Sequence, residues 1–258
     1  NPKANLFPYS MFRYIVVTRV TVDVYVSGAK DLLVYNNHGK LDPAKPFNPF
    51  GPIPSCNSFL ALGHFESAQK NLIDMKINLE WGELPDTRGG FEEHYRGYDT
   101  PYANDAFTAT MSVLRDGNWK PETGNGKGKL SLFDTRSPGG KIDRRKTLPV
   151  VVLDYLKPIR PGVKQEDFKH ALDSRDGFVK VTLSEPKCAF GHAAYPPLLN
   201  KTLAENARRK KPKPIPGPPY TPLLNSLALD YQARTVIDMR LNRGEERGQY
   251  VDKVFHIH

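Results

Sequence analysis

The chain has 258 residues, with 37 lysines or arginines against 28 aspartates or glutamates and a formal net charge of +9. This length can form one large or two modest domains with real hydrophobic cores. No run of about 18 apolar residues is present, which excludes a membrane-spanning helix. Two cysteines, Cys56 and Cys188, are too few for a disulfide scaffold or a four-thiolate metal site. One bridge between them is an alternative, but two isolated buried thiols are favoured.

The first half of the chain predicts antiparallel strands. Valine alternates with polar or aromatic residues from Arg19 to Ser27, and the same two-residue period recurs from Leu72 to Trp81. Shorter strands are predicted at residues 31–35, 59–62, 106–114 and 130–134. Several short strands with turns between them, and no alternation of strands with helices, favour an antiparallel sandwich over a parallel sheet.

The second half is more mixed. A strand is predicted at residues 178–183, a helix from Pro197 to Arg209 with apolar residues every fourth position, and a further strand at 226–239. We therefore expect a mainly β fold with a smaller mixed α/β part. An antiparallel β-sandwich-like domain is expected at 1–140, a linker-like stretch at 141–165 and an α+β domain at 166–258. The start at Asn1 and the apolar ending Val254–His258 suggest a fragment of a longer chain.

The sequence lacks a convincing catalytic or metal-binding set. Three groups are candidates: Glu92, Glu93 and His94; His256 and His258; and Cys188 with His192. Consecutive side chains of a strand cannot share one site, so the first group favours a solvated turn. The second lacks a third ligand, and the third lacks a basic neighbour that would activate the thiol. We expect no enzymatic activity, no metal and no cofactor.

The excess of positive charge is concentrated in two runs, residues 144–146 and residues 208–211 with Lys213. Such runs can contact phosphates. Aromatic residues are not interleaved with them, however, so a stacking platform for single strands is unsupported and nucleic acid is not the expected partner. Solvated linkers and docking strips for an acidic protein explain the runs as well.

Two aromatic, proline-containing strips also stand out, at residues 46–54 and 91–102. Proline fixes the backbone, so such a strip loses little entropy when a partner binds it. Each strip either covers the core of its own domain or docks another molecule. The candidate partner-docking residues are Phe47, Pro49, Phe50, Tyr95, Tyr98, Arg208, Arg209, Lys210 and Lys211.

The order of short motifs along the chain resembles one known family. The motifs are Pro46-Phe-Asn-Pro-Phe-Gly-Pro-Ile-Pro54, Ser58-Phe59, Leu62-Gly63, the alternating segment Leu72–Trp81, Leu84-Pro85, Tyr95-x-Gly-Tyr98, Asp116-Gly-x-Trp119, Leu132-Phe133, Gly177-Phe178, Ala189-Phe-Gly-His192, Tyr195-Pro196, Pro219-Tyr-Thr-Pro222 and Leu227-x-Leu-x-Tyr231. This collinear set is similar to the large baseplate J-like wedge proteins of contractile injection systems, which include contractile phage tails, type VI machines and extracellular injection particles. The likeness extends from about residue 46 to the end, and family members are much longer.

The resemblance implies a structural, non-enzymatic role. Such subunits pair with a related wedge protein, and six wedges surround a central spike hub and contact sheath-initiator-like proteins. The ring holds the sheath extended until target contact and then starts contraction. We therefore expect the chain to be assembled in the bacterial cytoplasm as part of a phage-tail-like particle. Release of that particle would place it outside the cell.

Two other functions remain alternatives. A secreted β-sandwich module that binds glycan or a cell surface would present an exposed aromatic row, for which Tyr98, Tyr102 and Trp119 are the candidates. A hydrolase would need the acidic and histidine residues at 92–94 to converge in a pocket.

Overall fold

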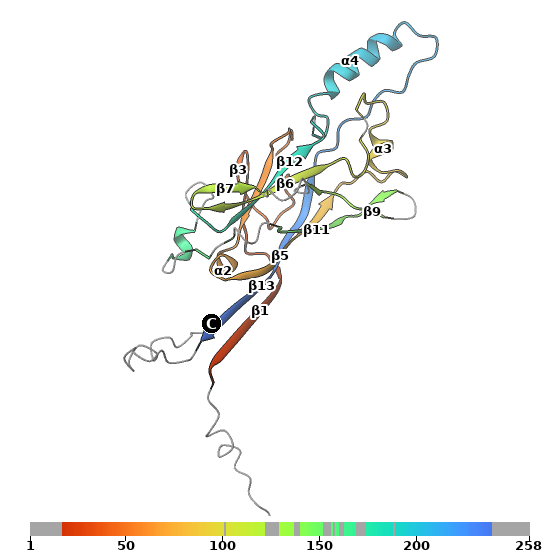
Figure 1. Cartoon of the computed structure of the whole chain (residues 1–258). Coiled ribbons are helices and arrows are strands. Elements are labelled where there is room, and N and C mark those ends of the chain that lie inside the picture. Colours follow the sequence, from red (N-terminus) through yellow and green to blue (C-terminus); the bar gives the residue numbers. More distant parts are fainter. Residues whose placement is uncertain are drawn as a thin grey trace, which may run out of the picture. The chain divides into compact units, whose positions relative to one another are not determined.

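The computed structural model describes residues 17–100, 102–121, 129–136, 140–151, 156, 158–159, 163–168, 174–187 and 189–238. The chain is mainly β with few helices, and its sheets are antiparallel, as the sequence predicts (Figure 1). It divides into two compact units. The larger comprises Val24–Ala233, and the described residues of the smaller are 17–23 and 234–238.

The first sheet has four strands in the order β1-β13-β5-β11. Their bounds are Arg19–Ala29 for β1, Leu223–Asp238 for β13, Leu72–Gly82 for β5 and Arg145–Pro149 for β11. The two-residue period predicted in β5 is confirmed, because Met75, Ile77, Leu79 and Trp81 are buried on one face. Both neighbours of β5 pair with it antiparallel, with Ile77 opposite Leu229 of β13.

The second sheet has seven strands. Six follow the order β3-β2-β4-β12-β6-β7, and β8 also pairs with β6. The bounds are Leu33–Asn36 for β2, Gly39–Leu41 for β3, Phe59–Gly63 for β4, Thr108–Arg115 for β6, Asn118–Pro121 for β7, Lys129–Ser131 for β8 and Phe178–Glu185 for β12. A separate pair consists of β9 (Thr135–Arg136) and β10 (Lys141–Ile142).

The expected division at residues 141–165 does not match these sheets. The strand β12, from the expected C-terminal domain, lies between β4 and β6 of the expected N-terminal domain. Likewise β11 and β13 pair with opposite edges of β5. Strands on both sides of the expected linker therefore share both sheets, and Val24–Ala233 is one compact unit. Hydrophobic periodicity identifies a strand but does not say which strand it pairs with.

The main core contains residues from both sheets, which gives the unit its sandwich-like character. In β4, Leu60 and Leu62 join this core, whereas Ala61 points to a second, smaller cluster with Phe178 and Phe168. Alternate residues of the seven-stranded sheet thus pack on opposite faces.

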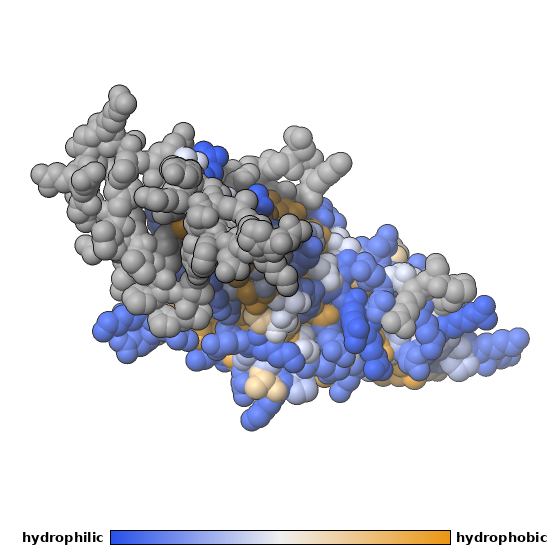
Figure 2. All heavy atoms as spheres, turned by 90° about the horizontal axis from the view of Figure 1, so that it is seen from below, coloured by the Kyte–Doolittle hydropathy of each residue, from blue (hydrophilic) through white to orange (hydrophobic). Residues whose placement is uncertain are grey.

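The helices of the described residues are short: α2 (Phe65–Ala68), α3 (Phe91–His94), the 3₁₀ helix η2 (Gln165–Asp167) and α4 (Tyr195–Asn206). No helix in the described part of the chain is both long and apolar enough to cross a membrane. Among the coloured residues visible in Figure 2, most are hydrophilic and the hydrophobic ones form separate small patches.

Candidate partner-docking surface

The helix α4 leads into a loop of consecutive cations. Pro196 lies in its first turn, where a missing N–H costs no helical hydrogen bond, and the Thr202 hydroxyl donates to the carbonyl of Leu198 at 2.9 Å. The predicted helix is therefore present, although it begins at Tyr195 and ends at Asn206. Its apolar stripe is not fully buried, because Leu203 is 45% exposed. Apolar surface is thus left open just before the cations.

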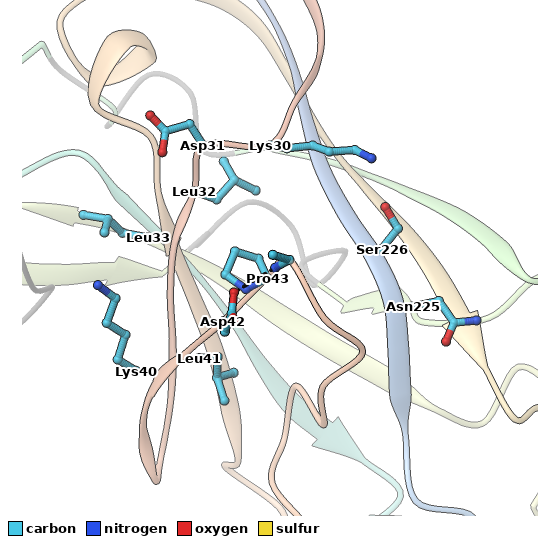
Figure 3. A pocket seen from close by; sticks show the side chains of 11 residues that line it. Lys30, Asp31, Leu32, Leu33, Lys40, Leu41, Asp42, Pro43, Asn225 and Ser226 are labelled. Atoms are coloured by element: carbon cyan, nitrogen blue, oxygen red, sulfur yellow. Dashed lines mark hydrogen bonds between the residues drawn. The ribbon is translucent and has the colours of Figure 1, made fainter.

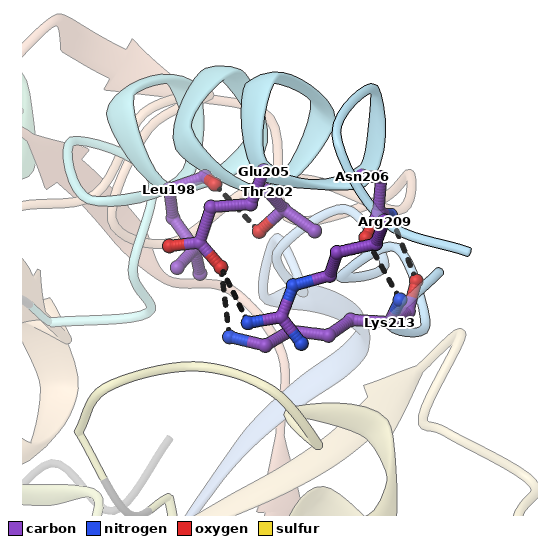
Figure 4. Close-up of polar contacts among 6 residues, drawn as sticks. All are labelled: Leu198, Thr202, Glu205, Asn206, Arg209 and Lys213. Atoms are coloured by element: carbon purple, nitrogen blue, oxygen red, sulfur yellow. Dashed lines mark hydrogen bonds and ion pairs between the residues drawn. The ribbon is translucent and has the colours of Figure 1, made fainter. Parts of the chain in front are cut away.

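The loop of residues 208–213, here called the cationic loop, is closed at its base by two side chains of α4. The Glu205 carboxylate accepts a hydrogen bond from Lys213 Nζ at 2.8 Å and lies 3.8 Å from the Arg209 guanidinium. The Asn206 amide donates to the carbonyl of Lys213 at 2.9 Å and accepts from its backbone N–H at 2.8 Å (Figure 4). The hydrogen bond from Lys213, with the nearby positive charges, lowers the pKa of Glu205. We call this closure the clasp.

The loop presents concentrated positive charge, including Arg209 beside the clasp. Arg208, Arg209, Lys210 and Lys211 are all exposed. Residues 198–214 contain six cationic side chains and one carboxylate. More than half of the chain's net charge of +9 therefore lies in this short segment. A surface of this kind attracts an acidic partner over about 8–10 Å at physiological salt.

The proline-rich segment between the cationic loop and β13 is fixed to the core by tyrosines. The Tyr98 hydroxyl donates to the carbonyl of Gly217 at 2.8 Å. The Tyr95 hydroxyl donates to the carbonyl of Phe190 at 2.8 Å and accepts from the N–H of Tyr220 at 3.0 Å. Burial raises the pKa of both Tyr95 and Tyr98, so their hydroxyls stay protonated and able to donate.

Histidines also contact this segment. The His94 side chain lies near the backbone of Pro218, and His192 Nε2 lies 2.8 Å from the Thr221 hydroxyl. Burial lowers the pKa of both imidazoles and that of His64, which accepts a hydrogen bond from a backbone N–H of α2. These three, called the desolvated histidines below, are therefore neutral near pH 7.

The first aromatic strip belongs to the core and not to a docking surface, which corrects the expectation for Phe47, Pro49 and Phe50. All three are buried, and Phe50 is only 1% exposed. The backbone of Phe47 exchanges hydrogen bonds of 3.0 and 2.9 Å with Leu224 of β13. The prolines thus hold two rings against the chain's own sheet, which is the alternative that the sequence left open.

The second strip is also largely internal. Tyr95 is buried and stacks on Tyr102, with ring centroids 4.2 Å apart, while Tyr98 is half-buried. Tyr95 is therefore not accessible to a partner, as a docking residue must be. Tyr98 instead fixes the proline-rich segment through its hydrogen bond. Of the predicted docking residues, the four cations of the loop are those that lie exposed.

The acidic and histidine residues of α3 do not converge on one site. Glu92 is exposed, Glu93 forms an ion pair with Arg96, and His94 turns towards the backbone of Pro218. Cys56 is a free, half-buried thiol. The expectations for Cys188, His256 and His258 lie outside the described residues.

The aromatic row expected of a glycan-binding face is not formed by the three candidates. Tyr102 lies in the core, and Tyr98 packs against Tyr95. Trp119 instead contacts the ammonium of Lys180, whose nitrogen lies 4.3 Å from the ring centroid.

An open cleft of about 740 Å³ lies beside the β2–β3 hairpin and the start of β13 (Figure 3). Its charged lining residues are Lys30, Asp31, Lys40 and Asp42. Two cations and two anions balance one another, so the electrostatics of the cleft do not favour a ligand of either charge.

Sequence reasoning identified the cations of the loop but missed Glu205 and Asn206, which shape it. The available signal was an asparagine near the predicted helix end, a residue type that often ends helices. Its partner, Lys213, lies seven residues further along the chain. Only the fold shows that the two meet.

No protein-family model matches the chain, and no curated protein matches it in sequence. A functional conclusion therefore depends on the geometry of the chain's own residues and on the resemblance of its motif order.

Proposed function

We propose that the chain is a structural subunit of a multiprotein particle, a wedge component of the baseplate of a contractile injection system. The cationic loop is then one of its docking surfaces. The observation that carries the proposal is the clasp: two side chains of α4 close the loop, and its four leading cations remain exposed. A closed, charged loop suits recognition of a neighbour because little conformational entropy is lost on contact.

The positions of the motif residues support the likeness to wedge proteins at the level of fold. Phe50, Gly63, Trp81, Phe190 and Tyr220, each from a different motif, are all buried. Motifs that build a core are those expected to persist between proteins that share a fold but differ in their neighbours. Partner choice then depends on exposed side chains such as those of the cationic loop.

The partner that fits this loop is an acidic protein surface. Exposed ion pairs each contribute little, about 0–1 kcal/mol, and are weakened by salt. Several such contacts together hold a subunit in place and still allow a ring to rearrange on triggering. The proposed partners of the cationic loop are the related wedge protein, the sheath-initiator-like protein and the spike hub.

The proposal is tested by neutralising the loop in the cells that make the particles. Arg208, Arg209, Lys210 and Lys211 are replaced together by glutamine, and sheathed particles are purified by sedimentation, imaged and analysed by mass spectrometry. We expect the variant to be absent from the particle fraction, or assembled particles to be lost, with an unchanged melting temperature of the purified chain. The melting temperature should persist because the four side chains are exposed.

A matched control removes the same number of exposed cations elsewhere. Its four substitutions to glutamine are at Lys45, Arg88, Lys120 and Lys187. The control should enter particles normally. If the wild-type chain never sediments with sheathed particles, the baseplate proposal fails and a free glycan-binding module becomes the leading alternative. If the chain is present but both variants assemble normally, the loop is not a docking surface.

A further inference from the structure

The strand β1 forms an outer edge of the four-stranded sheet, and its neighbour on the inner side is β13. It has 11 residues, from Arg19 to Ala29, whereas strands in globular proteins average about five or six. Most of its side chains are exposed, including Tyr25 at 70% and Val22 at 39%. An edge strand presents a row of backbone N–H and C=O groups that a further strand can pair with.

The other sheet edges of the described chain carry features that discourage pairing. In the two larger sheets, each of the other edge strands has five residues or fewer and contains lysine: β3, β7, β8 and β11. In the separate pair, β9 and β10 have only two residues each. Proline, which cannot donate to a neighbouring strand, also ends β7 and β11. Short length, lysine and proline are the usual protections against unwanted strand addition.

The strand β1 has none of these protections, since its sequence contains no lysine and no proline. Its single acidic side chain, Asp23, is engaged by Arg234 of β13 through two hydrogen bonds of 2.6 and 3.1 Å. The negative charge of Asp23, which could repel an incoming acidic strand, is therefore paired with Arg234 of β13, the strand on the other side of β1. The valines of β1 are β-branched and extend the apolar stripe on which a neighbouring strand packs.

The strand is also held in place for pairing. The Asp230 carboxylate of β13 accepts hydrogen bonds from the N–H of Gly28 at 2.7 Å and the Ser27 hydroxyl at 3.1 Å, and its second oxygen accepts from Asn78 at 2.7 Å. Val26 packs against the main core. Because β1 is already fixed as a strand, it loses little conformational entropy when a partner binds, which favours binding.

From these observations we propose that the outer edge of β1 binds an extended strand of another protein by β-strand addition. This proposal rests on the proposed role in an assembly and names the kind of partner: a strand in which apolar and polar or acidic residues alternate. Only a strand supplies donors and acceptors at the spacing of this edge. A partner other than a second copy is favoured because each copy carries a net charge of +9.

The test uses the full chain and a capped peptide of the same length as β1, in which valine alternates with threonine and glutamate. Binding is measured by calorimetry, and amide hydrogen exchange locates it. We expect saturable binding and slower exchange within β1. A peptide of equal composition with proline at its centre should bind about five- to tenfold more weakly, because one central hydrogen bond is lost.

Two variants, Val24→Pro and Tyr25→Pro, identify the edge. Consecutive N–H groups of a strand point to opposite sides, so one variant loses a bond to β13 and melts earlier, whereas the other loses only an outward donor. The variant with the wild-type melting temperature should bind the alternating peptide about five- to tenfold more weakly. Equal binding by that variant, or slower exchange only outside β1, would overturn the proposal.

Sedimentation analysis of the chain without peptide gives an independent outcome. We expect a monomer at every concentration. A dimer that the alternating peptide dissociates would overturn the choice of partner, because the edge would then serve a second copy. Peptide binding by a chain that never enters sheathed particles would leave strand addition standing while the baseplate proposal fails, so the two failures are distinguishable.

Discussion

Replacing Phe50 by alanine separates a core role from a docking role for the first aromatic strip. Phe50 is 1% exposed and belongs to the main core. Removing a buried phenylalanine ring forfeits its burial and leaves a cavity, which costs about 3–5 kcal/mol. For a unit of this size, 1 kcal/mol shifts the melting temperature by about 2–4 °C. We therefore expect Phe50→Ala to melt about 10 °C below the wild type.

The matched control lies three residues further along the same proline-rich crossing. Ile53 is 70% exposed, so Ile53→Ala should change stability by no more than about 0.5 kcal/mol. Thermal unfolding by circular dichroism and urea titration measure both variants, and an unchanged urea slope with a lower midpoint would identify a loss of stability. Equal melting temperatures for the two variants would refute the core assignment of Phe50 and restore the strip as a candidate docking surface.

Three further expectations concern the core and the segment that carries the cationic loop. Tyr95→Phe should lower stability by about 1–3 kcal/mol in thermal melts, since it leaves a buried carbonyl and N–H without their hydroxyl partner; an unchanged melting temperature would contradict that contact. Gly63→Ala should also destabilise, by about 1–3 kcal/mol in urea titration, because the added Cβ would stand 2.6 Å from the Phe178 ring; co-substitution Phe178→Leu should recover part of the loss. The free energy of unfolding should be constant above pH 7 and decrease below about pH 6.5. Burial lowers the pKa of the desolvated histidines, so the unfolded chain binds protons in this range that the folded chain does not. A melting temperature that stays constant from pH 8 to pH 4 would exclude this linkage.

The strands were predictable where hydrophobic periodicity alone decides them. The apolar residues of Leu72–Trp81 recur at every second position from Ile73 onward, and the structure places the segment as β5. Met75, Ile77, Leu79 and Trp81 are buried as predicted, whereas Ile73, at the beginning of the strand, is 45% exposed. Pairing was not predictable, because it depends on which apolar faces meet across long separations. The strand β12 illustrates this: its sequence identifies a buried strand, but only the fold places it between β4 and β6.

The candidate site followed a similar pattern. A run of cations is visible in any sequence, and its exposure follows from the cost of burying unpaired charge. The aromatic strips were ambiguous because proline-fixed rings have the same sequence pattern whether they close a core or bind a partner. Burial of Phe47 depends on its pairing with Leu224, which lies far along the chain.

The proposed docking loop and the proposed strand-binding edge are connected through one strand. From the cationic loop, the chain passes the tyrosine-anchored segment and enters β13 at Leu223. The same strand pairs with β5 and accepts the hydrogen bonds of β1 at Asp230. A force applied at the loop therefore acts first on the hydrogen bonds that fix this segment, which include those of Tyr95, Tyr98 and His192. These bonds are few compared with the ladder between β13 and β5, so the anchored segment is the element expected to yield first when an assembled neighbour moves.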